Sequence, residues 1–74
     1  MSTTYAVSYL DPLLEAIRAD YREMPGMRLS PAQFRRLWNL DERLYRQVTG
    51  ILVAEGFLRM DHRRRFYWTA PARP

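Results

Sequence analysis

Three helix-start signals fix where the helices of this chain can begin. Asp11-Pro12 and Ser30-Pro31 each place a capping side chain directly before a proline. Proline is favoured at the first position of a helix, where its missing N–H leaves no hydrogen bond unmade. Asp41 supplies a third capping side chain without a proline. The sequence therefore predicts three helices that begin directly after these caps.

Apolar residues follow each start at helical spacing, which gives every predicted helix one face for a core. The predicted helices cover residues 12–24, 31–38 and 42–55. Their apolar stripes are Leu14, Ile17, Tyr21 and Met24, then Phe34, Leu37 and Trp38, and finally Tyr45, Val48, Thr49 and Leu52. Residues typical of helix ends follow the stripes, namely Pro25-Gly26, Asn39 and Gly56.

Short β-rich segments occupy the remaining positions. "MRL" (27–29) lies between a turn and a helix cap, and is expected to form a strand of a single rung. "FLRM" (57–60) and "RFYW" (65–68) are joined by the four residues "DHRR" and predict a hairpin. The fold class is therefore α+β and mainly α.

Composition narrows the class of protein. The chain has 74 residues, 47% of them hydrophobic and 14% aromatic, which is too apolar for a disordered chain. It has no cysteine and a single histidine, His62, so we expect no disulfide, no metal site and no other cofactor. We expect neither a signal peptide nor a membrane span, and therefore a cytoplasmic protein.

The positive charge of the chain favours a polyanionic partner. The net charge is +4, and all twelve basic residues are arginine. Arginine suits phosphate and guanine because its planar fork donates two parallel hydrogen bonds. A GC-rich genome is the more ordinary explanation of the missing lysine, so the absence of lysine carries little weight.

The order of elements resembles that of a winged helix-turn-helix domain. The residues that carry the resemblance are Leu29-Ser30, "FRRLWNLD" (34–41) and "LYRQVTGILVAEGFL" (44–58). The resemblance implies three helices, a short strand and a C-terminal hairpin called the wing. It covers residues 10–69, between an N-terminal arm (1–9) and a C-terminal tail (70–74). Two positions depart from the family pattern: the second helix has Phe34 or Arg35 where a small residue is usual, and the wing tip has no glycine.

The resemblance implies that the third helix enters the major groove of DNA. Its DNA-facing residues are then Arg43, Arg46, Gln47 and Gly50. Arginine bonds guanine O6 and N7, glutamine bonds adenine N6 and N7, and glycine lets the backbone approach the duplex. An ordinary solvated helix face has the same composition.

Further candidate contacts to phosphate lie outside the third helix. Ser30, at the start of the second helix, offers backbone N–H groups to a phosphate, although helix capping alone explains it. Arg36, like its neighbour Arg35, is a candidate for the DNA backbone. The wing tip contributes Arg63, Arg64 and Arg65, for which a solvated hairpin is the alternative.

These expectations combine into a small transcriptional regulator that binds duplex DNA, is nucleoid-associated and has no enzymatic activity. A homodimer is expected, formed through the N-terminal arm, the first helix or Trp68. The main alternative is a winged-helix module for protein interaction or assembly, and folded RNA is a third partner class. A continuous basic face favours DNA, whereas neutralisation by Glu42, Asp61 and Glu55 favours the interaction module.

Overall fold

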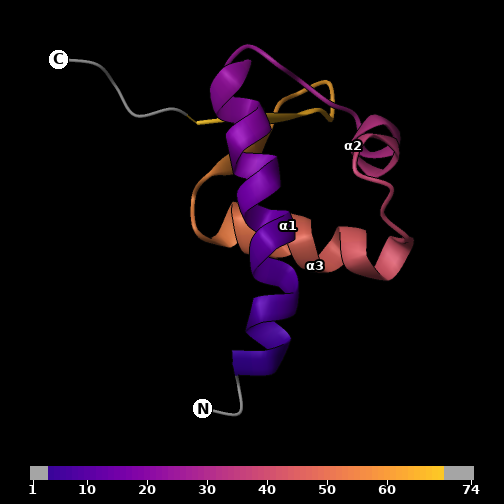
Figure 1. Ribbon diagram of the computed structural model, residues 1–74. Helices are drawn as coiled ribbons and strands as arrows, with labels where there is room; N and C mark the ends of the chain where they lie inside the picture. Colours follow the sequence, from indigo (N-terminus) through magenta and orange to yellow (C-terminus); the bar gives the residue numbers. More distant parts are fainter. Residues whose placement is uncertain (1–3, 70–74) are drawn as a thin grey trace, which may run out of the picture.

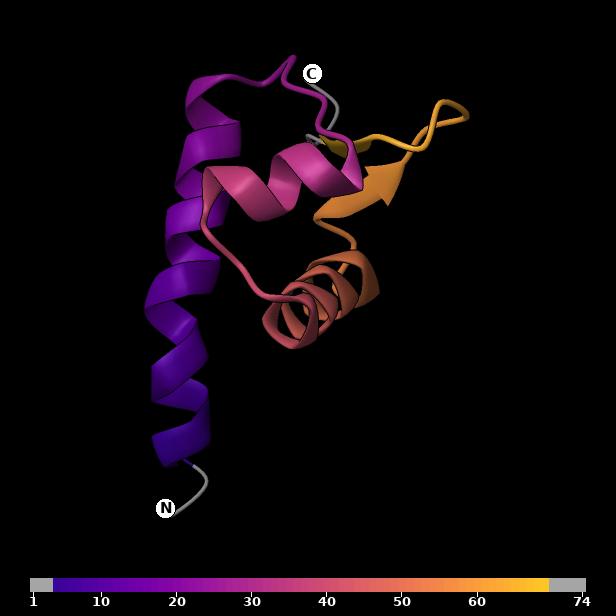
Figure 2. The ribbon, with the colours of Figure 1, turned by 90° about the vertical axis from the view of Figure 1, so that its right-hand side faces the viewer.

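The computed structural model describes residues 4–69, with the side chains of residues 10–69. It contains three helices and one two-stranded antiparallel sheet: α1 (Thr4–Glu23), α2 (Pro31–Leu37), α3 (Glu42–Ala54), β1 (Leu58–Met60) and β2 (Phe66–Trp68). The predicted fold class, α+β and mainly helical, is confirmed. Helix α1 lies along one side in Figure 2, α3 crosses behind it in Figure 1, and the hairpin lies above α3 in both views.

Helix α1 begins earlier than expected. It starts at Thr4, so Pro12 lies inside the helix, and most of the segment expected as an arm is helical. Proline accepts helical backbone angles at its own position and removes one hydrogen bond, here the one to the carbonyl of Ser8. A cap followed by proline therefore permits a helix start without requiring one. Residues 1–3 and the expected tail at 70–74 lie outside the described residues.

Helix α2 has a complete cap at each end. Ser30 Oγ accepts from the amide of Gln33 at 3.2 Å, and Gln33 Oε1 accepts from the amide of Ser30 at 2.9 Å. At the other end Asn39 has a φ of 53°, the left-handed conformation expected there. The amides of Asn39 and Leu40 donate back to Arg36 O and Arg35 O, at 3.3 and 2.8 Å. These two bonds close the helix and turn the chain toward α3.

Helix α3 is bounded in the same way. Asp41 accepts from the amide of Leu44 at 2.8 Å, which confirms it as the cap. Gly56 has a φ of 82°, a conformation that costs other residues backbone strain. The amides of Gly56 and Phe57 then donate to Val53 O and Leu52 O, at 3.0 and 2.9 Å. The glycine thus turns the chain directly from α3 into the hairpin.

The hairpin carries a third, single-rung partner. Strands β1 and β2 pair with Met60 opposite Phe66 and Leu58 opposite Trp68. Leu29 forms an isolated antiparallel bridge with Phe66, so the prediction of a one-rung strand at 27–29 is confirmed. This bridge attaches the segment before α2 to the hairpin.

The core gathers residues from every element. Its buried members are Leu14, Ile17, Tyr21, Phe34, Leu40, Val48, Leu52, Leu58 and Phe66. Two residues expected in apolar stripes are exposed instead: Met24 at 60% and Leu37 at 51%. Met24 lies beyond the end of α1, and Leu37 lies on the last turn of α2 and points away from the core. Trp68 is half-buried and stacks on Phe57, with ring centroids 5.5 Å apart.

Phe66 connects the helices to the hairpin. Its carbonyl accepts hydrogen bonds from the amide of Leu29 and from the buried hydroxyl of Tyr21, both at 3.0 Å. Its ring lies 5.3 Å from that of Phe34 and 6.3 Å from that of Tyr45. Burial raises the pKa of Tyr21, so its hydroxyl remains a donor at neutral pH.

None of the described helices is long and apolar enough to cross a membrane.

Truncation of Phe66 is expected to destabilise the whole domain. Phe66→Ala removes a ring that is 5% exposed, and should lower the free energy of unfolding by about 3 kcal/mol or more. Phe66→Leu keeps most of the volume and should cost less. Urea unfolding followed by tryptophan fluorescence measures both variants. A loss below about 1 kcal/mol for Phe66→Ala would contradict the central position of this ring.

Candidate nucleic-acid interface

Positive charge is concentrated in the part of the chain that follows α1. Residues 28–69 contain nine arginines and four acidic residues, whereas α1 contains two arginines and four acidic residues. In Figure 2, α1 lies along the left and the hairpin extends to the right, away from it. The basic part of the chain therefore includes a hairpin tip that projects away from α1.

The outer face of α3, made of Arg43, Arg46, Gln47 and Gly50, is exposed as predicted. It lies opposite the buried side chains of Val48, Thr49 and Leu52. Thr49 satisfies its hydroxyl within the helix by donating to the carbonyl of Tyr45 at 2.8 Å. The core contacts of α3 therefore determine which of its residues face solvent.

One member of this face has an acidic partner. Arg46 Nη2 lies 3.1 Å from Glu42 Oε2, one helical turn earlier. Both side chains are well exposed, at 75% and 64%, and such a surface pair contributes less than about 1 kcal/mol. Arg46 can exchange this partner for another anion at little cost. Glu55 points elsewhere, because its carboxylate binds Arg18 of α1 at 2.6 Å.

The hairpin tip, residues 61–65, separates the three arginines that the sequence places together. Arg63 and Arg64 are exposed. The side chain of Arg65 is 37% exposed. Its Nε is buried and lies 3.6 Å from Asp61 Oδ2. The expected cluster therefore provides two solvent-facing guanidinium groups, while the third lies beside a carboxylate.

Asp61 organises the hairpin tip. Its Oδ1 accepts from the amides of Arg63 and Arg65, both at 2.9 Å, and its Oδ2 accepts from Arg28 Nη1 at 3.0 Å. Desolvation works to raise the pKa of this carboxyl, but the donors from Arg65, Arg28 and Arg63 outweigh it and hold the pKa below its ordinary value. The carboxylate thus fixes the backbone that presents Arg63 and Arg64.

Sequence reasoning missed the part that Arg28 plays. Besides its contact with Asp61, its guanidinium lies 4.4 Å from the ring centroid of Tyr67. Arg28 thereby links the segment before α2 to both sides of the hairpin. Its partners are more than thirty positions away in the sequence, and no local pattern marks them.

The backbone of Arg64 is in the left-handed region, with a φ of 62°. Its amide donates to Asp61 O at 2.9 Å, and Arg65 O accepts from the amide of Asp61 at 2.9 Å. Glycine is the residue favoured at such a position of a hairpin turn. An arginine there costs about 1 kcal/mol in backbone strain.

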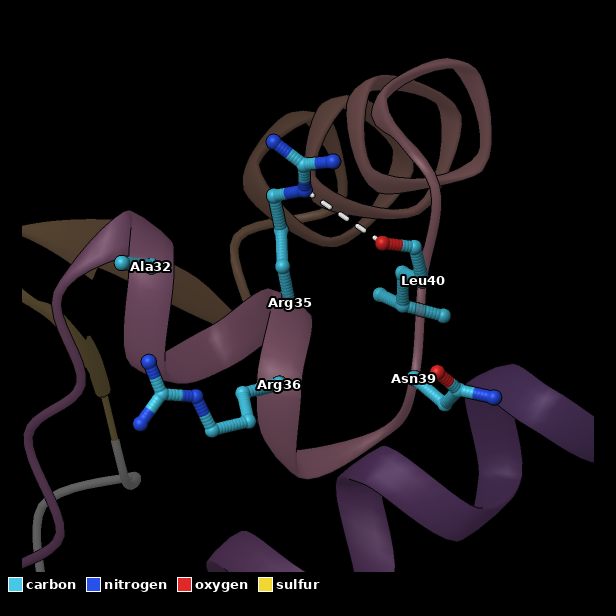
Figure 3. A pocket seen from close by; sticks show the side chains of 5 residues that line it. All are labelled: Ala32, Arg35, Arg36, Asn39 and Leu40. Atoms are coloured by element: carbon cyan, nitrogen blue, oxygen red, sulfur yellow. Dashed lines mark hydrogen bonds between the residues drawn. The ribbon is translucent and has the colours of Figure 1, made fainter.

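Ser30 and Arg36 lie at the start of α2 and on its last turn, and of the two only Arg36 is exposed. The amide and hydroxyl of Ser30 are both used in the capping box with Gln33, which leaves fewer donors for a phosphate. Arg36 lines a hollow of about 290 Å³ together with Ala32, Arg35, Asn39 and Leu40. Figure 3 shows that the two arginines extend in different directions, Arg35 toward α3 and Arg36 away from it. This hollow therefore does not bring the two guanidinium groups to one point.

Comparison of the chain with protein-family models, with curated proteins and with solved structures found no significant match. Among the described residues, no group of histidine and acidic side chains gathers closely enough to hold a metal ion.

Replacement of Arg64 by glycine is expected to stabilise the domain. Arg64→Gly relieves the left-handed strain but adds freedom to the unfolded chain, so a net gain of about 0.5 kcal/mol is expected. Arg63 is not among the residues with positive φ, so Arg63→Gly is the matched control and should lower stability. Thermal unfolding measures both. Destabilisation by Arg64→Gly as large as that by Arg63→Gly would contradict a strained Arg64.

The stability of the domain is expected to fall at low pH through Asp61. Because the folded-state pKa lies below that of the unfolded chain, the contribution is complete above about pH 4. It is lost as the pH falls through the lowered folded-state pKa. Asp61→Asn should remove this part of the acid sensitivity and lower the melting temperature at neutral pH. Melting temperatures of both proteins from about pH 6 to pH 2 test this. If the two melting temperatures fall in parallel as the pH is lowered, the prediction is contradicted.

Proposed function

We propose that the chain is a winged-helix domain that binds duplex DNA, with α3 in the major groove and the hairpin tip on the phosphate backbone. The observation that carries the proposal is the distribution of exposed arginines. Arg43, Arg63 and Arg64 are exposed and make no ion pair with another described residue. They belong to two elements, α3 and the hairpin, and the hairpin tip projects away from α1 (Figure 2).

The chemistry of the outer face of α3 supports base contact. Arg43 and Gln47 lie one helical turn apart and present the two side chains that form bidentate hydrogen bonds with guanine and adenine. A Cβ added at Gly50 meets no atom within 4 Å, so the surface is open where the backbone would approach DNA. The hairpin tip would then contribute contacts with phosphate that are independent of base sequence.

We further propose that the chain acts as a homodimeric, nucleoid-associated regulator. A single module of this size reads a short site, and a dimer reads two half-sites. The N-terminal turns of α1 extend past the rest of the molecule in both views and offer a surface to a second copy (Figures 1 and 2). Trp68 is already stacked on Phe57, which favours α1 over Trp68 as the contact.

A protein-interaction module is the second candidate. It is favoured by the two ion pairs that neutralise Arg46 and Arg65, and by the exposed Leu37 beside Leu29, Gln33 and Arg36. Duplex binding decides between the two candidates, because an interaction module gives none. If folded RNA is the partner, it should displace labelled duplex DNA from the protein more effectively than unlabelled duplex DNA does.

Duplex binding is expected to weaken steeply with added salt, and to be lowered by substitutions on α3 and the hairpin tip but not on α1. Anisotropy titrations should show binding at micromolar protein in about 50 mM salt. A plot of the logarithm of the binding constant against the logarithm of the salt concentration should fall with a slope of about 0.9 for each neutralised phosphate. Arg43→Ala and the double variant Arg63→Ala/Arg64→Ala should weaken it. Arg22→Ala is the matched control, since Arg22 is half-exposed on α1, and should leave the affinity unchanged.

Gly50→Ala separates contact from folding. Alanine meets open space there and favours the helix by up to about 1 kcal/mol, so stability should rise. A weaker affinity in this more stable variant then reports a close approach of the duplex. No binding at micromolar protein, or equal losses for Arg43→Ala and Arg22→Ala, would remove α3 from the proposed interface.

A further inference from the structure

The outer face of α2 carries an apolar hollow that the proposed DNA contacts do not use. This hollow has a volume of about 360 Å³, and four side chains line it: Leu29, Gln33, Arg36 and Leu37. Leu37 is 51% exposed, although it is a large apolar side chain. A hollow of this size, with apolar walls and a few polar groups, can take an apolar side chain of a partner.

The segment that leads into the apolar hollow has an open strand edge. The amide of Leu29 donates to Phe66 O at 3.0 Å, and its carbonyl accepts from the amide of Phe66 at 2.7 Å. Successive residues of a strand direct their backbone groups to opposite sides, so the amide and carbonyl of Arg28 point away from the hairpin. These two groups make no backbone hydrogen bond to a described residue, and Arg28 is exposed. The edge therefore offers one donor and one acceptor to another extended chain.

The open edge and the apolar hollow lie in the relation that one extended peptide requires. In Figure 2 the segment between α1 and α2 passes above α2. A peptide residue opposite Arg28 would have its side chain on the face of Arg28, and its two neighbours would have theirs on the face of Leu29. Because Leu29 lines the apolar hollow, one of these neighbouring side chains would enter it. Backbone bonds then supply affinity, and the alternate side chains supply specificity.

The charge around the apolar hollow determines the kind of peptide. Arg36 is exposed and forms no ion pair with a described residue. The sequence of α2, PAQFRRL, contains two arginines and no acidic residue. A carboxylate beside the apolar side chain of the peptide would pair with this charge, whereas a basic residue there would be repelled.

This charge disfavours both a second copy and the C-terminal tail of the chain as the occupant. Two copies of the edge that pair symmetrically about Arg28 would place the two arginines opposite each other, and like charges directly opposite are destabilising in a sheet. Residues 70–74 contain one arginine and no acidic residue. The occupant that matches the charge is therefore an acidic segment of another protein.

We propose that the apolar hollow and the open edge at Arg28 together dock an extended acidic peptide of a partner protein. Its apolar side chain lies in the hollow, its neighbouring carboxylate pairs with Arg36, and its backbone adds a strand beside the single rung at Leu29. Neither the outer face of α3 nor the hairpin tip lines the hollow, so the proposal does not rest on duplex binding.

A synthetic peptide tests this surface directly. The probe is the capped peptide Glu-Thr-Leu-Thr-Glu, which in extended form has Leu and both Glu side chains on one face. It should shift the backbone amide NMR signals of residues 28–37 more than those of residues 43–50. Gln-Thr-Leu-Thr-Gln lacks the charge, Glu-Thr-Ser-Thr-Glu lacks the apolar side chain, and each should bind several-fold more weakly. Equal binding of either control peptide, or no shift at residues 28–37 at the highest soluble concentration of the probe, would overturn the proposal.

Substitutions on α2 test the two contacts separately. Leu37→Gln should weaken binding of the probe several-fold, and Arg36→Glu should reverse the preference, so that Lys-Thr-Leu-Thr-Lys binds better than the probe. Arg35→Gln is the matched control, because Arg35 extends toward α3 and does not line the apolar hollow, and it should leave the affinity unchanged. An Arg36→Glu variant that still prefers the acidic probe would overturn the proposal.

Two other occupants have their own signatures. Light scattering that shows self-association at increasing protein concentration, abolished by Leu37→Gln, would assign the apolar hollow to a second copy of the chain. Duplex DNA that shifts residues 28–37 and displaces the probe would assign it to nucleic acid. Either result would overturn the acidic peptide as the occupant.

Discussion

The backbone of Phe66 is the attachment on which the arrangement of the molecule depends. Its amide donates to Leu29 O at 2.7 Å, and its carbonyl accepts from both the amide of Leu29 and the hydroxyl of Tyr21. Buried backbone groups without partners are costly, so these bonds specify one position for the hairpin against α1 and the start of α2. The ring of Phe66 then packs on Phe34 and Tyr45, which adds α2 and α3 to the same point.

The arginines have two roles in this arrangement, since some join elements through ion pairs and others have no such pair. Those near the junctions between elements hold them together: Arg18 binds Glu55 across α1 and the end of α3, and Arg28 binds Asp61 across to the hairpin. On α1, Asp20 accepts a hydrogen bond from Trp38 Nε1 at 3.0 Å, so this acidic residue also contacts another part of the fold. Arginines without an ion pair to a described residue lie on α2, on α3 and in the hairpin. Stability and charge distribution thus follow from one set of contacts.

Most of the elements could be predicted from the sequence because their ends are local. Ser30, Asp41, Asn39 and Gly56 each act through bonds to residues within five positions, and each takes its expected role. The predicted helix start at Pro12 was wrong, because the same local signal can occur inside a longer helix. For the candidate site, the exposure of the outer face of α3 was predictable from helical periodicity.

The missing part of the site depends on contacts between distant residues. Asp61 separates Arg65 from its two neighbours through a turn geometry that no short motif encodes, since the tip lacks the usual glycine. Arg35 bonds the carbonyl of Leu40 only after Asn39 has turned the chain. Charge pattern in the sequence therefore identifies the basic elements, but the folded chain decides which guanidinium groups are paired with carboxylates.

The central claim is that α3 and the hairpin tip form one surface for duplex DNA. The most direct measurement is a titration of isotopically labelled protein with a short duplex, followed through the backbone amide signals. The account predicts that the largest shifts fall at residues 43–50 and 62–65, while residues 14–21 of α1 change little. Shifts confined to α1, or spectra unchanged by duplex, would contradict it.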